Sequence, residues 1–218
     1  MSDSDCLPPD SPNPPSSLLT VAVTGPIASG KSVVLSVASE MAGVETVDAD
    51  KLAWATYEPG TTVYREVVNE FGSRVVDSRG RIDREKLAEI VFGDRSRLEK
   101  LESIVHPAVM EKLRMRKHGL PRNTRLFVVE GAKLLQSKHI DLSFFDRILL
   151  VDVDESTQLE RLRERDGLTI DEARRRIEAQ NFSEKELLAS VDFVIRADGS
   201  KCSTRNRARR IFNQLLGG

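Results

Sequence analysis

The stretch that decides the fold of this chain is Gly25-Pro26-Ile27-Ala28-Ser29-Gly30-Lys31-Ser32. It matches the pattern G-x-x-x-x-G-K-S/T, in which backbone N–H groups of a glycine-rich turn surround a polyphosphate. The apolar run Leu18–Thr24 before it predicts a buried strand, and Val33–Met41 after it predicts a helix. Together they predict a nucleotide-binding loop, because the helix N-terminus adds a partial positive charge. The alternative is a coincidental glycine turn.

The side chains of this loop indicate how it would hold a nucleotide. Lys31 is the cation expected to reach the β- and γ-phosphates, and the Ser32 hydroxyl is the expected ligand of Mg²⁺. The motif identifies a nucleotide-binding site but not the reaction. The residues predicted to contact the nucleotide are Gly25, Pro26, Ile27, Ala28, Ser29, Gly30, Lys31, Ser32 and Val33.

The composition of all 218 residues indicates a globular, cytoplasmic protein. Apolar residues make up 39% and charged residues 31%, and no stretch has the length and apolarity of a membrane span. A net charge of −1 argues against broad electrostatic binding to nucleic acid or anionic lipid. Cys6 and Cys202 lack metal-ligand spacing, so we expect reduced thiols. Residues 1–17 are rich in Ser, Pro and Asp, do not resemble a signal peptide, and predict a disordered leader.

From residue 18 onward strands and helices alternate, which is typical of a parallel α/β sheet. About 75 residues of helical character separate the second predicted strand from the third, broken at Glu58-Pro59-Gly60 and at Asp77–Gly80. A connection of this length predicts a small helical insertion. Two further helical segments are expected at 155–182, interrupted at Asp166-Gly167, and at 204–216. The predicted strands are Leu18–Thr24, Glu45–Val47, Arg125–Glu130, Arg147–Val151 and Asp192–Ile195.

Two aspartates, Asp48 and Asp50, follow the second predicted strand. Ligands of open α/β sheets bind outside the carboxyl ends of the strands, so both carboxylates are expected near the phosphate-binding loop. In a kinase such a carboxylate can take the proton of an attacking hydroxyl, and we assign this role to Asp50 rather than to Asp48. The alternative is that either aspartate caps the following helix. A GTPase is disfavoured, because the chain has no Asn-Lys-x-Asp motif.

An arginine-rich segment follows the fourth predicted strand. Phosphotransferases need cations that close over the transferring phosphoryl group, so two helices broken at a glycine are a candidate mobile lid. Within it, Arg161 and Arg165 are expected to serve the reaction. The other arginines, which we expect to be solvated, are Arg163, Arg174, Arg175 and Arg176. The simpler alternative is an exposed, charged helix face without a catalytic role.

Further motifs accompany these segments. In chain order the motifs read GPIASGKS, VDADKLA, EPG, GRIDREKLAEIVF, IVHP and QLERLRERDGLT. With this combination the chain, from about Leu18 to Gly199, resembles dephospho-CoA kinases. The resemblance implies transfer of the ATP γ-phosphate to the 3′-hydroxyl of dephospho-CoA. It also implies a parallel-sheet α/β fold of the P-loop nucleoside-monophosphate-kinase type. One domain, 18–218, would comprise a core (18–50, 124–153 and 188–218), a helical substrate insertion (51–123) and a lid (154–187).

The resemblance also implies roles for single residues, with ATP and Mg²⁺ as cofactors. Asp50 is the implied base for the 3′-hydroxyl, and Lys31 and Arg161 are the other implied catalytic residues. His106 is implied to contact the acceptor, and the alternative for this residue is a packed or capping role. The implied partner is dephospho-CoA, bound by a monomer or small homo-oligomer that contacts neither nucleic acid nor membranes. Further implied contacts are Arg165 with ATP and Asp50, His106, Glu130 and Gln180 with the acceptor.

The chain departs from the family pattern at three places. In the loop, Pro26, Ala28 and Val33 replace two glycines and a threonine, and a proline lacks the N–H donor. After the third strand the family's D-x-P-L-L-F-E is replaced by the segment from Glu130 to Gln136, and Ala197 stands where the family has an asparagine. Two alternatives stay open: a small-molecule phosphotransferase with another acceptor, and a nucleotide-binding protein without catalysis.

Overall fold

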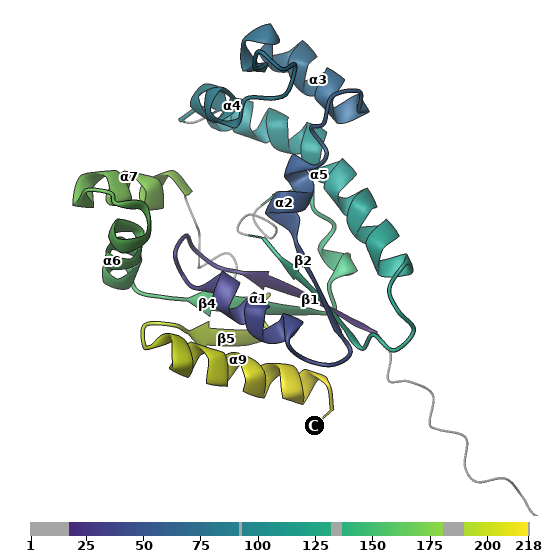
Figure 1. The fold of residues 1–218 in the computed structure, drawn as a ribbon, viewed down its shortest axis with the longest axis vertical. Coiled ribbons are helices and arrows are strands. Elements are labelled where there is room, and N and C mark those ends of the chain that lie inside the picture. The colour runs from purple at the N-terminus through teal and green to yellow at the C-terminus, as the bar shows by residue number, and fades with distance from the viewer. Residues whose placement is uncertain (1–17, 92, 132–136, 181–189, 218) are drawn as a thin grey trace, which may run out of the picture.

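A five-stranded parallel sheet, with the strand order β2-β3-β1-β4-β5, forms the centre of the computed structural model (Figure 1). The structure describes residues 18–91, 93–131, 137–180 and 190–217. The predicted leader therefore lies outside the described residues, as do 132–136 and 181–189. The strands are β1 Leu19–Thr24, β2 Val44–Asp48, β3 Leu126–Glu130, β4 Arg147–Asp152 and β5 Phe193–Arg196. The predicted sheet is confirmed, with each strand end within one residue.

Helices cover both faces of this sheet, which explains why its strands are apolar without alternation. On one face α1 (Lys31–Ser39) packs against α9 (Lys201–Leu215), and Val21 of β1 joins the same buried cluster as Phe212 of α9. The next residue of β1, Ala22, points to the other face and joins a cluster with the helices between β2 and β3. Successive side chains of β1 thus enter two different cores.

The connection from β2 to β3 is helical, as its composition predicts. Its helices stand to one side of the sheet in Figure 1, packed on one another around buried residues such as Val67, Leu87 and Leu113. The helices α3 and α5 begin at capping side chains, since Thr61 accepts a hydrogen bond from the Tyr64 N–H and Asp94 accepts one from the Arg97 N–H. The helices are α2 Ala49–Trp54, α3 Thr62–Phe71, α4 Arg84–Val91 and α5 Arg95–His118, with a short 3-10 turn at Ser73–Val75.

Two helices, α6 (Glu155–Asp166) and α7 (Ile170–Gln180), follow β4 and stand apart from α3 and α4 in Figure 1. Gly167 ends α6 with a φ of +68°, the left-handed conformation that the predicted break at this glycine requires. The last helix was expected from residue 204, but α9 begins at Lys201 because the Ser200 hydroxyl caps it. The end of the helical segment predicted to reach residue 182 lies outside the described residues.

Candidate active site

The phosphate-binding loop joins β1 to α1, as predicted. Gly25 has a φ of +154°, and a Cβ there would lie 2.2 Å from the Val151 carbonyl oxygen, so only glycine fits. Gly30 precedes α1 with a φ of +99°. Between them Ala28 has a φ of +59°, a left-handed conformation that costs energy in a residue with a Cβ. The loop therefore depends on close backbone approach and on an unusual turn.

Lys31 begins α1, and its ammonium group folds back over the loop. Its Nζ donates hydrogen bonds to the carbonyl oxygens of Gly25 and Pro26, both at 3.0 Å. Burial lowers the pKa of Lys31 below its ordinary value of 10.5, while the carboxylates of Glu130 and Asp50 act to raise it. The ammonium group is therefore within electrostatic reach of both acidic side chains.

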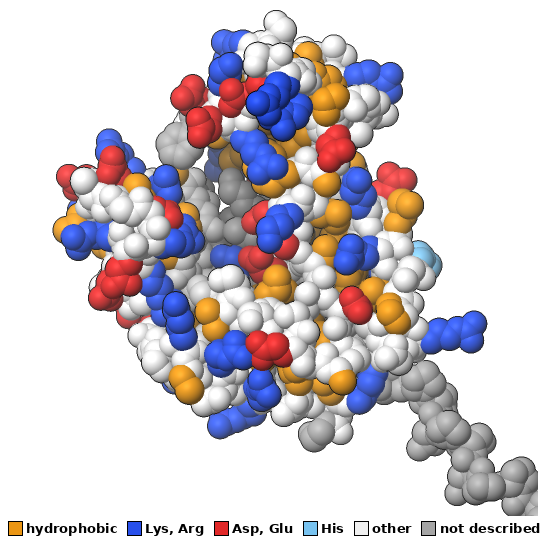
Figure 2. All heavy atoms as spheres, in the orientation of Figure 1, with side chains coloured by type: hydrophobic (Ala, Val, Ile, Leu, Met, Phe, Trp, Pro, Cys, Tyr) orange, Lys and Arg blue, Asp and Glu red, His pale blue; other side chains and the backbone are white. Residues whose placement is uncertain are grey.

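A cavity of about 680 Å³ lies between the loop, the helices α2 and α5, and the helices α6 and α7. Figure 2 shows the surface hollowed between the part that carries α6 and α7 and the part that carries α3 to α5. Of the nine loop residues predicted to contact the nucleotide, four do not line the cavity: Gly25, Pro26, Ser29 and Val33. The predicted side chains that the cavity brings together are Lys31, Ser32, Asp50, His106, Glu130, Arg165 and Gln180, joined by Ile27, Ala28 and Gly30 of the loop.

Glu130 is the last residue of β3, and the strand register places it beside Val23 of β1 and Asp48 of β2. Burial raises its pKa to about 7. Lys31 opposes this shift, and the neighbouring charges of Asp48 and Asp50 add to it. Glu130 is thus a carboxyl group that titrates near neutral pH at the wall of the cavity.

The two aspartates after β2 have different positions. Asp48 is the N-cap of α2, because its Oδ1 accepts a hydrogen bond of 2.9 Å from the Lys51 N–H. Its carboxylate also lies 3.1 Å from the Lys51 ammonium group. Asp50 belongs to the first turn of the same helix and lines the cavity. The capping alternative therefore applies to Asp48, whereas the assignment of Asp50 as the base stays a prediction.

Two arginines of the predicted lid reach the cavity wall, Arg165 from α6 and Arg176 from α7. Both pair with Asp166, at 2.7 Å and 2.8 Å. The sequence left Arg176 among the solvated arginines, and it is indeed exposed, yet its position on the wall was missed. The spacing could have indicated this position, because Arg176 lies one turn before the predicted site residue Gln180 on the same face of the helix.

Arg161 and Gln180 bind the backbone of the loop. The Arg161 guanidinium donates to the carbonyl oxygens of Ala28 and Ser29, both at 3.1 Å, and to that of Ala197 after β5. Gln180 accepts a hydrogen bond of 2.5 Å from the Ile27 N–H. Arg161 does not line the cavity, so a direct contact with the nucleotide stays a prediction for this residue.

His106 is half-buried on α5, with Nδ1 2.7 Å from the Ser137 hydroxyl, and it also lines the cavity. The packed role and the predicted substrate contact are therefore compatible. Beside it runs an apolar wall that the sequence reasoning missed, although its helical spacing is a usable signal. The residues of this wall are Ala53, Trp54 and Tyr57 around α2 and Leu98, Leu101 and Val105 on α5.

The residues at the loop fit Mg²⁺ of the kind that accompanies nucleotides. The Ser32 hydroxyl and the carboxylate of Glu130 are hard oxygen donors on the wall of one cavity. Among the described residues no group of three or more His, Cys, Asp or Glu side chains could hold a metal ion by itself. This set suits Mg²⁺, which commonly keeps waters and binds substrate phosphates.

None of the described helices has both the length and the apolarity needed to cross a membrane. A family model for dephospho-CoA kinase (CoaE) matches residues 19–202. The chain is 41% identical over 196 residues to the dephospho-CoA kinase of Geobacillus kaustophilus, a match that covers 90% of this chain and 96% of the relative.

Two solved structures show the same architecture. Protein TT1252 of Thermus thermophilus superposes with a TM-score of 0.76 at 30% identity, covering 92% of this chain and 99% of that one. A shikimate kinase of Acinetobacter baumannii, at 15% identity with a TM-score of 0.56, covers 93% of this chain and 95% of its own, and shares the fold alone. The matched region, 19–202, contains the loop, both aspartates and α2 to α7. The chain therefore belongs to the dephospho-CoA kinase family of ATP-dependent kinases.

Proposed function

We propose that this chain transfers the γ-phosphate of ATP to the 3′-hydroxyl of dephospho-CoA, giving coenzyme A and ADP, with the side chains of the cavity in the roles described here. The observation that carries these roles is one cavity lined by Lys31 and Ser32 of the loop and by Asp50 and Glu130. Phosphoryl transfer depends mainly on positioning and on charge neutralisation. A cavity that combines phosphate-binding groups with a carboxylate base meets both requirements.

The loop and the lid form the donor side. Lys31 exchanges its carbonyl partners for oxygens of the β- and γ-phosphates, and the Ser32 hydroxyl holds Mg²⁺, which neutralises phosphate charge when it is bound. Arg165 and Arg176, held together by Asp166, supply positive charge on the lid wall. Because Arg161 contacts loop carbonyls, it acts here as a positioning residue for the loop.

The acceptor side lies along α2 and α5. Asp50 takes the proton of the 3′-hydroxyl as the oxygen attacks the γ-phosphorus. Glu130, with a pKa of about 7, is partly protonated near neutral pH and can donate or accept a hydrogen bond at the ribose. His106 contacts the acceptor, and the apolar residues of α5 pack against its adenine.

An assay of ADP release tests the proposal. ADP formation with dephospho-CoA, and not with a panel of nucleosides, nucleotides and small alcohols, is the expected result, and ³¹P NMR of the product should show a new 3′-phosphate. Preference for another acceptor would indicate a different phosphotransferase. ATP binding without ADP from any acceptor would indicate a nucleotide-binding protein without catalysis.

Three further properties stay predictions: the location, the oligomeric state and the lack of nucleic-acid binding. We propose a cytoplasmic location, which the composition and the expected reduced state of the two widely separated cysteines support. We also propose a monomer or small homo-oligomer that does not bind nucleic acid, since the net charge is −1. Sedimentation velocity measures the oligomeric state, and a nucleic-acid shift assay measures nucleic-acid binding.

A further inference from the structure

His106 and Ser137 form a hydrogen-bonded pair at the wall of the cavity beside the phosphate-binding loop. His106 lies on α5 and lines that cavity, whereas Ser137, between β3 and β4, is only 6% exposed and does not line it. The distance from Nδ1 of His106 to the Ser137 hydroxyl oxygen is 2.7 Å. Nδ1 is therefore turned toward a buried hydroxyl, and Nε2 is the ring nitrogen that a ligand in the cavity can meet.

The hydrogen bonds of the Ser137 hydroxyl indicate which ring nitrogen of His106 carries the proton. The hydroxyl oxygen accepts a hydrogen bond of 3.3 Å from the backbone N–H of His139. Within the described part of the chain, the hydroxyl proton has no acceptor other than Nδ1 of His106, and an unpaired proton on a buried hydroxyl is costly. Ser137 therefore donates to Nδ1, and in the neutral imidazole the ring proton then lies on Nε2.

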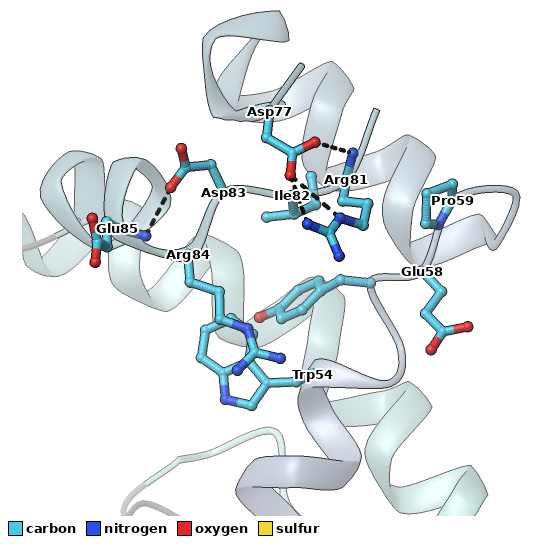
Figure 3. Close-up of a pocket in the computed structure, with 10 residues that line it drawn as sticks. Trp54, Glu58, Pro59, Asp77, Arg81, Ile82, Asp83, Arg84 and Glu85 are labelled. Atoms are coloured by element: carbon cyan, nitrogen blue, oxygen red, sulfur yellow. Dashed lines mark hydrogen bonds and ion pairs between the residues drawn. The ribbon is translucent and has the colours of Figure 1, made fainter. Parts of the chain in front are cut away.

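The side of the cavity formed by α2 and α5 is rich in hydrogen-bond acceptors. Asp50 and Glu102 contribute carboxylates, and of the described α5 residues on the wall only His106 carries an N–H group in its side chain. The ring of Trp54 also lines this side, but it extends to a second cavity, of about 570 Å³. There the guanidinium carbon of Arg84 lies 4.2 Å from the centroid of that ring (Figure 3). His106 is thus placed to add an uncharged donor among carboxylates.

We propose that Ser137 is a positioning residue that holds His106 in the Nε2–H form, so that His106 donates a hydrogen bond to an oxygen of the acceptor and does not act as a base. This inference rests on the proposed function, in which His106 contacts the acceptor and Asp50 takes the proton of its hydroxyl. A ring nitrogen that already carries a proton cannot accept another, and Ser137 occupies the basic nitrogen, Nδ1. The pair therefore leaves proton transfer to Asp50.

The first test is ¹⁵N NMR of the imidazole rings, because the chemical shift of each ring nitrogen shows whether it carries a proton. The chain has three histidines, and a His106→Gln variant, which lacks one set of signals, assigns those of His106. At about pH 8, where an ordinary imidazole is neutral, the wild type should carry the proton on Nε2. Ser137→Ala should shift the His106 signals toward a mixture of both tautomers, and Ser137→Thr, which keeps the hydroxyl, should restore the Nε2–H form.

Steady-state kinetics test the consequence for the reaction. We expect Ser137→Ala to raise the KM for dephospho-CoA about 2- to 10-fold with little change in kcat, because one neutral hydrogen bond is weakened, and to leave the KM for ATP unchanged. His106→Asn should raise the KM for dephospho-CoA more than His106→Gln, since only the longer amide reaches the position of Nε2. The matched control is Ser103→Ala, which removes a hydroxyl of α5 outside the cavity and should behave as the wild type.

A proton on Nδ1 of His106 in the wild type, or an unchanged tautomer in Ser137→Ala, overturns the inference. A fall in kcat of about 100-fold or more in both His106 variants at an unchanged KM would make His106 a base and overturn it as well. Melting curves show whether Ser137→Ala folds; if it does not, the NMR spectrum of the wild type and the two His106 variants still decide. Absence of turnover in the wild type overturns the proposed function instead, while the NMR spectra still determine the tautomer.

Discussion

Ala28 occupies a backbone position that suits glycine better than alanine. Its φ of +59° lies in the left-handed region, which costs a residue with a Cβ about 1 kcal/mol or more. The sequence shows that a glycine of the family pattern is replaced here, but only the structure shows what the glycine provides. In this turn the carbonyl oxygens of Ala28 and Ser29 accept hydrogen bonds from the Arg161 guanidinium.

We expect Ala28→Gly to raise the free energy of unfolding by up to about 1 kcal/mol, because relief of the strained φ exceeds the entropy that glycine adds to the unfolded chain. Urea denaturation measures this change. The control is Ala88→Gly at an exposed position of α4, which should lower the free energy of unfolding by about 1 kcal/mol. Destabilisation by both substitutions would contradict the idea of strain at Ala28.

Glu130 makes stability depend on pH. Its pKa is raised from 4.5 to about 7, chiefly by burial. Between these pH values the folded chain holds a proton that the unfolded chain has lost, so the free energy of unfolding should fall as pH rises from about 4.5 to about 7. Glu130→Gln cannot ionise, and its stability relative to the wild type should therefore increase with pH across this window.

Urea denaturation at about pH 5 and about pH 8 measures this dependence on the Glu130 carboxyl. Glu66→Gln, at an exposed position of α3, controls for the loss of a surface carboxyl. A stability difference between Glu130→Gln and the wild type that is the same at both pH values would sink the assignment of the raised pKa.

At the scale of elements, the start of α2 places two aspartates in two different positions. Asp48 caps the helix through the Lys51 N–H, and Asp50, two residues later, faces the cavity. The sequence favoured Asp50 over Asp48 as the base but left capping open for both, because capping and catalysis favour the same residue type at the same strand end. Which aspartate caps α2 depends on the residue at which the helix begins, and the hydrogen bonds of the folded chain set that residue.

We expect Asp48→Ala to lower the free energy of unfolding by about 1 kcal/mol through loss of the cap. We expect Asp50→Asn to preserve stability but to lower kcat by about two to four orders of magnitude, the usual contribution of a general base. Thermal melts and steady-state kinetics on both variants separate the two effects. A stability loss in Asp50→Asn with normal kcat would reverse the assignment.

At the scale of the whole molecule, Arg161 joins parts that are distant in the sequence. From α6 it binds the phosphate-binding loop and the backbone of Ala197 after β5. Ser29 and Ala197 are buried, so their carbonyl oxygens would lose a partner that water cannot easily replace. The position of α6 is therefore coupled to that of the loop.

We expect Arg161→Ala to lower the free energy of unfolding by about 1–3 kcal/mol without any nucleotide present, because buried carbonyl groups lose their donor. Arg163→Ala, on an exposed position of the same helix, should change it by less than about 0.5 kcal/mol. Urea denaturation compares the two variants. Equal effects of the two substitutions would show that the loss is not specific to Arg161, and that Arg161 does not hold the loop.

The sequence predicted the features that a short run of neighbouring residues encodes, and it missed those that depend on contacts between residues far apart in the chain. The five strands and the turn at Gly25 are local patterns of apolar residues and glycine, and they were predicted within one residue. The stacking of Arg84 on Trp54 joins residues 30 positions apart, and Arg161 bonds to positions more than 130 residues away. Such contacts depend on how helices pack, which no short pattern records.

The hydrogen bonds of the loop have a consequence for ATP affinity. Lys31 donates to the carbonyl oxygens of Gly25 and Pro26, and Gln180 accepts from the Ile27 N–H. An arriving triphosphate therefore has to compete with the protein's own groups. The free energy of ATP binding is the difference between the hydrogen bonds that the loop makes to the triphosphate and those that it gives up within the protein. Weakening an internal competitor, for instance by shortening Gln180, could tighten nucleotide binding without adding a single contact to the nucleotide.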